Sequence, residues 1–412
     1  MIYVHVPFCE SFCTYCGFYS VLVPGTKRNN DCVILSEAKN LCFGSYADAI
    51  CNEIVSRRDE IASTSSVNTL YIGGGTPSVL PLDVLSRIVH SIQNEVRNLS
   101  DCDEFTIEVN PEDIVKKGEE YVRGLLELGV NRVSMGVQSF DDGILRWMNR
   151  RHDAATAKEA FGLLRRCGVD NISIDLIFGL PQLDEYSLNS TIDQALALSP
   201  EHISAYQLSI EEGSTLEKLI VGGKFTEASD EQCRRQYDIL CERLGRAGYH
   251  HYEVSNFALP GREALHNSAY WRRVPYVGLG PGAHSLSADG VRSWNSEDIP
   301  KRLDDGSLRA YSQQEEILSP EDIRIERIML PLRTDSGLPE SELRSLAGDE
   351  PVDRLLSEGA LVFCREGALV FCREGALPPC HSERSEESTG EGSLRIPEDH
   401  FFVSNEIIRE LI

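Results

Sequence analysis

The stretch Ile2-Tyr-Val-His-Val-Pro-Phe-Cys9-Glu-Ser-Phe-Cys13-Thr-Tyr-Cys16-Gly-Phe18 lies near the start of a 412-residue chain and decides its fold. The first residues are β-branched and predict a strand over Ile2–Val6, and three cysteines follow at once in a C-x3-C-x2-C spacing. Three thiolates in one short loop can bind three irons of a [4Fe–4S] cluster and leave the fourth iron open to a small molecule. The spacing therefore predicts an iron–sulfur site on Cys9, Cys13 and Cys16.

The alternative interpretations of these cysteines are a zinc knuckle or chance thiols. Zinc needs four nitrogen or sulfur ligands, and no fourth Cys or His stands at a usual spacing. Position 18, where a further cysteine could extend the motif, is Phe18. Tyr15 and Phe18 would shield a cluster from water, which suits a low-potential site. The spacing and its context favour the iron–sulfur interpretation.

The composition indicates a globular protein, with 41% hydrophobic and 25% charged residues. The formal net charge is -25, from 65 acidic and 40 basic residues, and it argues against a nucleic-acid partner because it repels phosphate backbones. The sequence shows neither a long apolar run nor a signal peptide before Cys9, so we expect a cytoplasmic protein. In a reducing compartment, 13 cysteines favour metal ligands and free thiols over disulfides.

Short apolar strands alternate with amphipathic helices along the first part of the chain. The predicted strands are Ile2–Val6, Asn68–Ile72, Glu104–Val109, Arg132–Gly136, Asn171–Ile177 and His202–Ser209. The predicted helices between them include Leu82–Val96, Glu119–Leu128, Ala154–Cys167 and Ser187–Ala197. This alternation is typical of parallel βαβ units with right-handed crossovers, and six units favour an open, partial (β/α)6 barrel over a flat doubly wound sheet.

We expect three regions in the chain. Residues 1–250 form the partial barrel, residues 251–311 extend it, and residues 312–412 form a small C-terminal helical or winged-helix-like domain. The helices predicted in the last region are Glu321–Met329, Glu340–Leu346 and Val352–Glu358. The final stretch, Pro397–Ile412, predicts a strand and then a helix over Ile407–Leu411 that Ser404-Asn405 caps.

Two segments have the character of insertions. Residues 359–366 (GALVFCRE) are repeated at once as residues 367–374. In addition, the single DNA string TGTCATTCTGAGCGAAGCGAAGAATC encodes CHSERSEE (residues 380–387) in one frame and VILSEAKN (residues 33–40) when it is read one base later. We infer that a mobile DNA repeat landed twice, so that residues 26–45 and 367–395 are insertions in loops, the second one disordered, where added length costs little.

More groups with chemical potential follow the carboxyl ends of the predicted strands, where function gathers in α/β barrels. The second strand leads into Gly73-Gly74-Gly75-Thr76-Pro77, whose glycines let the backbone approach a ligand closely. Glu108 ends the third strand, Gln138 follows the fourth, and Asp175 lies on the fifth. Each alone is more often a cap or part of an ion pair, but with Arg150 they supply partners for a ribose (Glu108, Asp175) and for a carboxylate (Arg150).

The motifs resemble those of a known family. The segments concerned are HVPFC-x3-C-x2-C-x-F, YIGGGTPS, EVNP, RVSMGVQSF, DLIFGLP, YQLSIEEG, HYEVSNFA and HNSAYW. They are similar to motifs of the radical S-adenosylmethionine (SAM) enzymes of the oxygen-independent coproporphyrinogen III oxidase group. Within that group, they most resemble motifs of the HemW-type haem chaperones. The resemblance covers nearly the whole chain apart from the two inserted stretches. It implies that Cys9, Cys13 and Cys16 ligate the cluster and that its fourth iron chelates SAM. The SAM site that it implies is lined by Tyr3, Tyr15, Gly74, Gly75, Thr76, Glu108, Gln138, Arg150 and Asp175.

Two departures from the oxidases of this group bear on activity. Those enzymes carry a fourth cysteine where this chain has Phe18, and they have an N-terminal extension over the substrate, whereas here Cys9 stands close to the start. The chaperone subgroup instead carries HN-x2-YW, present here as His266-Asn267-Ser268-Ala269-Tyr270-Trp271. His266 could offer its imidazole to haem iron, with flat aromatic side chains beside it. Its structural alternative is a hydrogen-bonded histidine in a turn, and the other candidate haem ligands are His5, His251 and His284.

The resemblance implies a haem chaperone that holds a [4Fe–4S] cluster and SAM. Its expected partners are haem, the respiratory cytochromes that accept haem, an electron donor for the cluster and a second copy of the chain in a homodimer. Two alternatives stay open at this point. One is an oxygen-independent coproporphyrinogen III oxidase, which forms protoporphyrinogen IX by oxidative decarboxylation, and the other is a radical enzyme that acts on an unrelated substrate.

Overall fold

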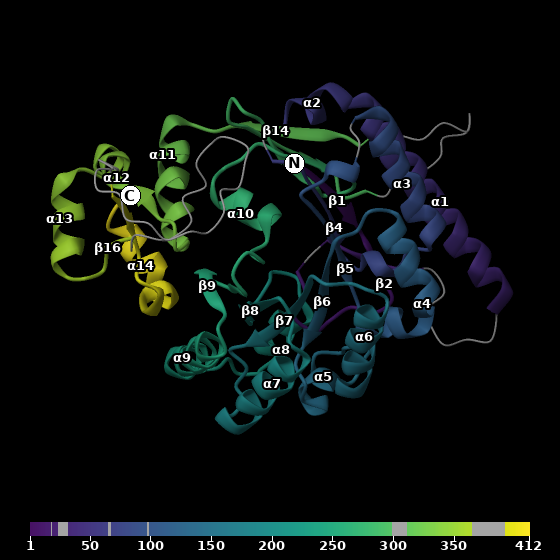
Figure 1. Cartoon of the computed structure of the whole chain (residues 1–412), viewed down its shortest axis with the longest axis horizontal. Coiled ribbons are helices and arrows are strands. Elements are labelled where there is room, and N and C mark those ends of the chain that lie inside the picture. The colour runs from purple at the N-terminus through teal and green to yellow at the C-terminus, as the bar shows by residue number, and fades with distance from the viewer. Residues whose placement is uncertain (18, 24–31, 65–66, 97–98, 299–310, 365–391) are drawn as a thin grey trace, which may run out of the picture. The chain divides into compact units, whose positions relative to one another are not determined.

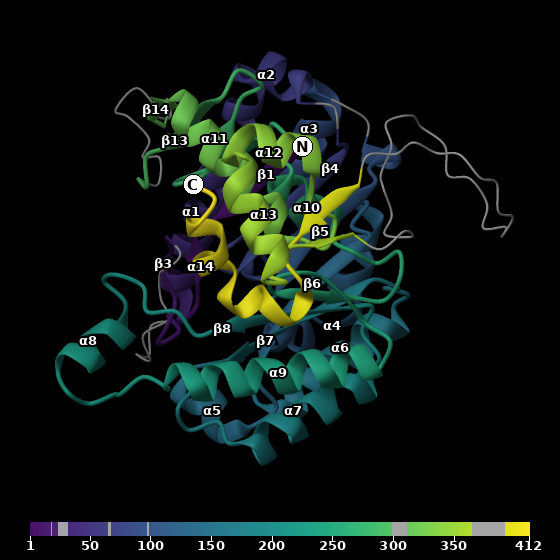
Figure 2. The same cartoon turned by 90° about the vertical axis from the view of Figure 1, so that its left-hand side faces the viewer.

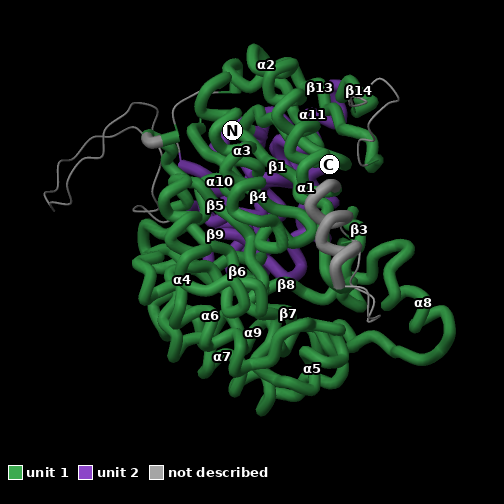
Figure 3. Tube along the Cα trace, turned by 90° about the vertical axis from the view of Figure 1, so that its right-hand side faces the viewer, with its two compact units in different colours: residues 1–250, 255–270, 274–318 green, residues 251–254, 271–273, 319–412 purple. Residues whose placement is uncertain are grey.

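The computed structural model describes the chain except for residues 18, 24–31, 65–66, 97–98, 299–310 and 365–391, and of residues 32–41 it describes the backbone alone. Two compact units make up the described part (Figure 3). Unit 1 consists of Met1–His250, Ser255–Tyr270 and Val274–Leu318, and unit 2 consists of His251–Val254, Trp271–Arg273 and Ser319–Ile412. The units therefore divide the chain at other positions than the three expected regions.

A largely parallel sheet forms the centre of unit 1 (Figure 1). Six strands that follow one another along the chain are parallel neighbours: β1 (Ile2–Val6), β4 (Thr69–Gly74), β5 (Glu104–Val109), β6 (Arg132–Gln138), β7 (Ile172–Phe178) and β8 (His202–Gln207). Parallel β11 (Val277–Leu279) extends the sheet beyond β1, and antiparallel β10 (Asn256–Ala258) extends it beyond β8. Strand β9 (His250–Glu253) precedes β10 along the chain, and all but its first residue belong to unit 2. The order does not return to β11 among the described strands, so the sheet is open, as expected for a partial barrel.

Helices connect the parallel strands and bury an apolar stripe against the sheet. They are α3 (Leu82–Glu95), α4 (Pro111–Glu127), α6 (Ala154–Arg166) and α7 (Glu185–Leu198). Three of them begin at a side chain that accepts a hydrogen bond from a free backbone N–H of the first turn: Asn110 for α4, Asp153 for α6 and Asp184 for α7. The expected helix from Glu119 is the second part of α4, because Gly118 interrupts that helix with a left-handed φ of 71°.

The remaining elements of unit 1 surround this core. The helices are α1 (Cys32–Ser56), α2 (Arg58–Ser63), α5 (Asp142–Trp147), α8 (Thr215–Val221), α9 (Asp230–Arg246), α10 (Leu265–Trp271, whose last residue is in unit 2) and the short 3-10 turns Pro77–Val79 and Leu99–Asp101. Figures 1 and 2 show α9 beside α7. Two small sheets complete the unit: β2 (Phe8–Cys9) pairs with β3 (Val21–Leu22), and β13 (Val291–Asn295) lies between β12 (His284–Leu286) and β14 (Gln313–Ile317).

Unit 2 combines helices with a small antiparallel sheet, as the expected helical, winged-helix-like domain does. Its helices are α11 (Pro320–Met329), α12 (Glu340–Ala347), α13 (Asp349–Ser357) and α14 (Ser404–Arg409), with 3-10 turns at Pro331–Arg333 and Glu398–Val403. Its strands pair in the order β15 (Leu338–Pro339), β17 (Ser393–Arg395) and β16 (Val362–Phe363). Helix α11 begins with a reciprocal cap between Ser319 and Asp322.

Three expectations about elements are wrong in detail. Residues 32–45 belong to helix α1 rather than to a loop, and Phe43 packs edge-on against Phe8 at 5.0 Å, so the end of the proposed first insertion contributes to the core. The last residues of the proposed second insertion form the central strand β17. The final helix starts at Ser404 itself without a side-chain cap, and a 3-10 turn that buries Phe401 replaces the expected strand. Residues 26–31 and 367–391 lie outside the described residues.

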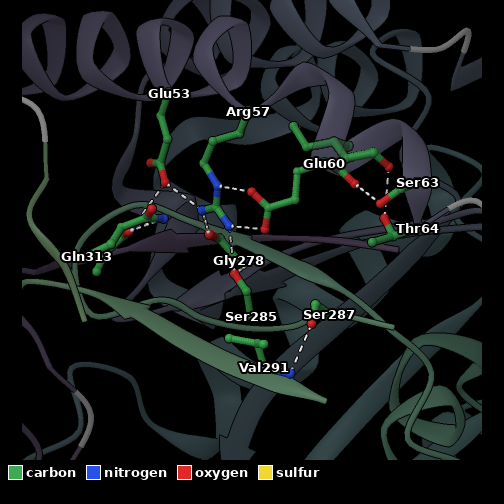
Figure 4. A network of polar contacts seen from close by, with 12 residues as sticks. Glu53, Arg57, Glu60, Ser63, Thr64, Gly278, Ser285, Ser287, Val291 and Gln313 are labelled. Carbon is green, nitrogen blue, oxygen red and sulfur yellow. Dashed lines mark hydrogen bonds and ion pairs between the residues drawn. The ribbon is translucent and has the colours of Figure 1, made fainter. Parts of the chain in front are cut away.

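A buried polar network fastens α1 to the strands beside β1 (Figure 4). Arg57 donates to Glu53 (3.0 Å), to both oxygens of Glu60 (2.7 and 2.8 Å), to Ser285 (3.0 Å) and to the carbonyl of Gly278 (2.8 Å). Because every charged group in it is paired, the network holds α1 against β11 and β12 without an isolated buried charge.

None of the helices that the structure describes is both long enough and apolar enough to span a membrane.

Candidate functional site

Cys9 ends the short strand β2, which follows β1, and Cys13 and Cys16 lie in the loop between β2 and its partner β3. Cys9 is buried, Cys13 and Cys16 are partly exposed, and none of the three is in a disulfide. The Sγ atom of Cys9 lies 3.5 Å from the hydroxyl of Thr76 at the end of β4. Burial raises the pKa of the Cys9 thiol, while hydrogen bonds to Thr76 and Ser20 act in the opposite direction. The loop therefore reaches the glycine-rich turn, as the sequence predicts.

Tyr15 and Arg150 interact electrostatically with the thiols of the cysteines. Arg150 donates from Nη1 to the Sγ atom of Cys13 at 3.3 Å. Burial raises the pKa of Tyr15, the neighbouring thiols of Cys13 and Cys16 raise it further, and Arg150 opposes them. Burial acts to lower the pKa of Arg150, but Tyr15 and Cys13 outweigh it, so this pKa is raised. The side chain of Arg150 is thus a permanent cation beside the three sulfurs.

The glycine turn has no room for side chains. Gly74 has a φ of 110°, and a Cβ there would lie 2.6 Å from the ring of His5. A Cβ on Gly75 would lie 2.8 Å from the carbonyl oxygen of Phe8, and the Gly75 amide donates to Val6 at 2.7 Å. Only glycine permits this close approach of two backbones. The turn therefore packs directly against β1 and the start of the cysteine loop, and this packing leaves no room for a side chain at Gly74 or Gly75.

Glu108 on β5 and Asp175 on β7 lie on the two strands that flank β6. Glu108 accepts hydrogen bonds from the hydroxyl of Tyr71 (2.8 Å) and from the amide of Gly74 (3.1 Å). Burial raises the pKa of Glu108 to about 7, and the negative charge of Asp175 adds to this shift. Asp175 accepts from Ser134 at 3.2 Å, and burial raises its pKa as well, against the influence of hydrogen bonds and of Arg132. Two carboxyl groups thus face one interior region.

Gln138 and Arg150 meet at the end of β6. The register of β6 against β7 shifts between Gly136 and Gln138, and Gln138 itself has a left-handed φ of 68°. A Cβ on Gly136 would lie 2.9 Å from the side-chain nitrogen of Gln138 and 3.2 Å from that of Arg150. The Nε atom of Arg150 is buried and has no hydrogen-bond partner among the described residues. Such an atom is costly unless a ligand meets it.

Tyr3 completes the predicted SAM set. Its hydroxyl lies 3.0 Å from the Nδ1 atom of His5, two residues further along β1. Burial raises the pKa of Tyr3, and the charge of Glu108 raises it further. The structure thus places the cysteines just beyond β1, and Thr76, Glu108 and Gln138 near or just beyond the carboxyl ends of β4, β5 and β6. Tyr3 is instead the second residue of β1, and Asp175 lies in the middle of β7. Three thiols, a bare glycine turn, an unpaired guanidinium N–H and two carboxyl groups fit a cluster with SAM on its open iron.

His266 lies deep in unit 1, with 1% of its surface exposed. Its Nδ1 atom is 2.8 Å from the hydroxyl of Thr69, and its Nε2 atom is 3.0 Å from the hydroxyl of Tyr270. Burial lowers its pKa to about 3, and the N-terminal charge and Arg132 add to this shift. Glu104 accepts from the amides of Leu265 and His266. The ring is therefore neutral, and hydrogen-bond partners occupy both of its nitrogens.

The other candidate histidines lie in different surroundings. Both ring nitrogens of His5 are within hydrogen-bond distance of partners, namely Tyr3 and the carbonyl of Tyr19. His251 belongs to unit 2, where it packs edge-on against Phe401 at 5.1 Å. His284 is exposed on β12 and stacks on Trp294, with ring centres 5.7 Å apart.

Sequence reasoning missed several polar residues on the inner face of the sheet. Thr69 and Tyr71 on β4, Glu104 on β5 and the fully buried Arg132 on β6 all support residues of the predicted sites. Their signal in the sequence is a polar side chain at every second position of a parallel strand, as in Glu104, Thr106 and Glu108 of β5. Parallel strands in such folds are usually apolar on both faces, so this alternation indicates an inner face that binds ligands.

Comparisons with known proteins agree with this geometry. Residues 3–195 match the family model described as the radical SAM superfamily. The chain is 33% identical over 370 residues to the heme chaperone HemW of Bacillus subtilis (strain 168), which covers 87% of this chain and 92% of that protein. It is also 33% identical over 347 residues to the heme chaperone HemW of Synechocystis sp., covering 84% and 80% of the two chains.

Among solved structures, the coproporphyrinogen III oxidase HemN from Escherichia coli, a radical SAM enzyme, superposes with a TM-score of 0.73. At 21% identity the alignment covers 100% of this chain and 89% of that one, so it shows a shared fold. The similarity in sequence to the chaperones is higher and also extends over most of the chain. The chain belongs to the HemW family of the radical SAM superfamily.

Proposed function

We propose that this protein is a haem chaperone, which binds haem and passes it to respiratory haemoproteins. The observation that carries the proposal is the 33% identity over 87% of the chain to a protein named heme chaperone HemW. The position of the motif residues near one edge of the sheet supports the proposal, because a shared fold alone does not require functional residues to lie close together.

The chain's own residues have distinct roles in this proposal. Cys9, Cys13 and Cys16 ligate a [4Fe–4S] cluster, which when bound supplies an open iron for SAM and a centre for one-electron reduction. The turn of Gly74, Gly75 and Thr76 accommodates the amino-acid end of SAM, and the unpaired N–H of Arg150 binds its carboxylate. Glu108 and Asp175 accept from the ribose hydroxyls. Tyr3, Tyr15 and Gln138 line the remaining walls.

His266 is our first proposal for the haem ligand. The imidazole must exchange one of its bonds, to Thr69 or to Tyr270, for the iron. The variants Thr69→Val and Tyr270→Phe each remove one partner and keep the imidazole, so we expect them to keep haem binding. We expect His266→Ala to weaken it, and the Soret band during a haem titration measures this. If the affinity is unchanged in His266→Ala and falls in His284→Ala, the exposed histidine is the ligand instead.

The alternative activity is decarboxylation of coproporphyrinogen III. The sequence argues against it because Phe18 stands in place of the fourth cysteine. One anaerobic preparation tests both functions: a haem titration, and an assay for protoporphyrinogen IX with reductant and SAM. We expect a Soret band and no turnover. Robust turnover without haem binding would reverse the assignment.

The proposed partners follow from the chaperone function. They are respiratory cytochromes that accept haem, an electron donor for the cluster and a second copy of the chain. A nucleic-acid partner does not fit a net charge of -25. Size-exclusion chromatography of the cluster-loaded protein, with and without haem, tests the homodimer.

A further inference from the structure

A short segment that contains the predicted SAM residue Arg150 contacts the cysteine loop with each of its five residues. We call residues Trp147–Arg151, which end α5 and follow it, the clamp segment. The carbonyl of Trp147 accepts a hydrogen bond from the hydroxyl of Thr14 (2.9 Å), and the carbonyl of Met148 accepts one from the amide of Thr14 (3.1 Å). The Asn149 side chain donates to the carbonyl of Phe12 (2.7 Å). Arg150 donates to the Sγ atom of Cys13 (3.3 Å), and Arg151 donates to the carboxylate of Glu10 (2.9 Å). Five consecutive residues of one segment thus contact four positions of the loop between Glu10 and Thr14.

The clamp segment is itself fixed by α5. The amide of Met148 donates to Ile144, and the amide of Arg150 donates to Leu145, each at 2.9 Å. Asn149 has a left-handed φ of 57°, which asparagine tolerates better than most residues. The described residues of the cysteine loop between Cys9 and β3, in contrast, belong to no helix or strand. The loop therefore takes its shape from a turn that the end of α5 holds rigid.

Arg151 is the most highly connected residue of the clamp segment. Its guanidinium lies between Glu10 of the cysteine loop and two carboxylates at the start of α4, Glu112 (2.9 Å) and Asp113 (2.8 and 2.9 Å). Asp113 also accepts from Ser78, which follows the glycine turn, at 2.7 Å. The carboxylates of Glu10, Glu112 and Asp113 are close enough to one another to ligate a metal ion, but each of them already forms an ion pair with the guanidinium of Arg151. The ion pairs of Arg151 therefore connect the cysteine loop to the start of α4.

We propose that the clamp segment sets the spacing of the three sulfurs, and that Arg151 is a positioning residue for the cluster that acts through Glu10. The inference rests on the proposed [4Fe–4S] cluster. The side chain of Arg151 is only 12% exposed, so its charge-assisted hydrogen bonds are screened less by water than those of a surface pair. Without this tether, mutual repulsion of three thiolates favours an open loop.

The test uses two variants that break the same ion pair from opposite sides. Arg151→Gln and Glu10→Gln both free the loop, but they change the net charge near the sulfurs in opposite directions. The full-length proteins are reconstituted anaerobically, and the visible absorbance of the cluster is followed while a chelator removes iron. We expect both variants to release iron about tenfold faster than the wild-type chain. Arg151→Lys keeps the charge but not the planar fork, and we expect it to restore the slow release only in part.

A matched control is Arg165→Gln, which breaks the ion pair in which the Nη2 atom of Arg165 donates to both carboxylate oxygens of Glu201 (2.7 Å each). We expect wild-type iron release from it. If both loop variants release iron at the wild-type rate, the inference is overturned. It is also overturned if one variant releases iron faster and the other more slowly, because the charge near the sulfurs would then matter rather than the tether.

Hydrogen exchange of the cluster-free proteins provides a second readout. We expect the amide of Thr14 to exchange faster in both loop variants while the amides of β4 and β5 keep wild-type rates. Unchanged exchange at Thr14 would contradict the tether. A wild-type chain that takes up no iron would instead reject the proposed function. A wild-type chain that takes up iron and releases it at the same rate as both loop variants would reject this inference alone.

Discussion

At the scale of single residues, the carboxyl group of Glu108 changes its charge near neutral pH because its pKa is raised. The pKa of Glu108 is raised from 4.5 to about 7, first by burial and then by Asp175, against the hydrogen bonds of Tyr71 and Gly74. A raised pKa means that the folded chain binds this proton more tightly than the unfolded chain does. The stability gained from it is full below the unfolded pKa and is lost as the pH rises through about 7.

We therefore expect the free energy of unfolding of the cluster-free wild-type chain to fall by about 2 kcal/mol, relative to Glu108→Gln, between about pH 5 and about pH 8. The glutamine variant is the control because its amide is neutral throughout. Urea denaturation at several pH values measures the difference. If the free energy of unfolding of the two proteins changes in the same way with pH, the pKa of Glu108 is not raised in the folded chain.

A second residue-scale prediction concerns the glycine turn. Gly74 and Gly213 both have a left-handed φ (110° and 77°), but only at Gly74 would a Cβ meet another group, the ring of His5. We expect Gly213→Ala to cost about 1 kcal/mol of stability and Gly74→Ala to cost about 2 kcal/mol or more. Thermal unfolding measures both. In a SAM titration of the cluster-loaded proteins, we expect reduced affinity for Gly74→Ala alone, and equal affinities would contradict the close-approach argument.

At the scale of elements, the attachment of α1 depends on buried charge. Arg57 is paired with two glutamates, and Arg58 beside it is 59% exposed with a long contact to Asp59 (3.7 Å). We expect Arg57→Ala to lower the free energy of unfolding by about 3 kcal/mol, because it leaves the buried carboxylate of Glu53 without its cation. We expect less than about 0.5 kcal/mol for the control Arg58→Ala. Urea denaturation of both variants measures this, and equal losses would mean that the network adds nothing specific.

The parallel strands were predictable as elements because each is a short run that alternates with a helical pattern. The ends of β1, β4, β5, β6, β7 and β8 differ from the expected ones by two residues or fewer. Helix α10 was not predicted as a helix. Its seven residues include His266, and Glu104 of β5, far away in sequence, accepts from its first amides. A helix that gains its cap from a distant strand has little local signal.

At the scale of the whole molecule, the proposed second insertion can be tested by removing it. Strand β16 pairs antiparallel with β17, Phe363 opposite Leu394, and the amide of Cys364 donates to Ser393 at 2.8 Å. Deleting residues 367–391 leaves a three-residue connection between Cys364 and Ser393 that ends in Gly392, a length that hairpins commonly use. We expect the melting temperature and the haem affinity to stay unchanged. A loss of either would show that the deleted residues contribute to the fold or to haem binding.

The sequence by itself determined the spacing of the three thiols and the order of the parallel strands, because each depends on neighbouring residues. The predicted SAM set came from the resemblance of the motifs and stays a prediction. Only the tertiary structure decided which distant groups support them. Arg150 reaches Cys13 across 137 positions, and Thr69 meets His266 across 197. Such contacts depend on where the sheet places α5 and α10. No local pattern encodes that placement, because the hydrophobic burial that drives it is not directional.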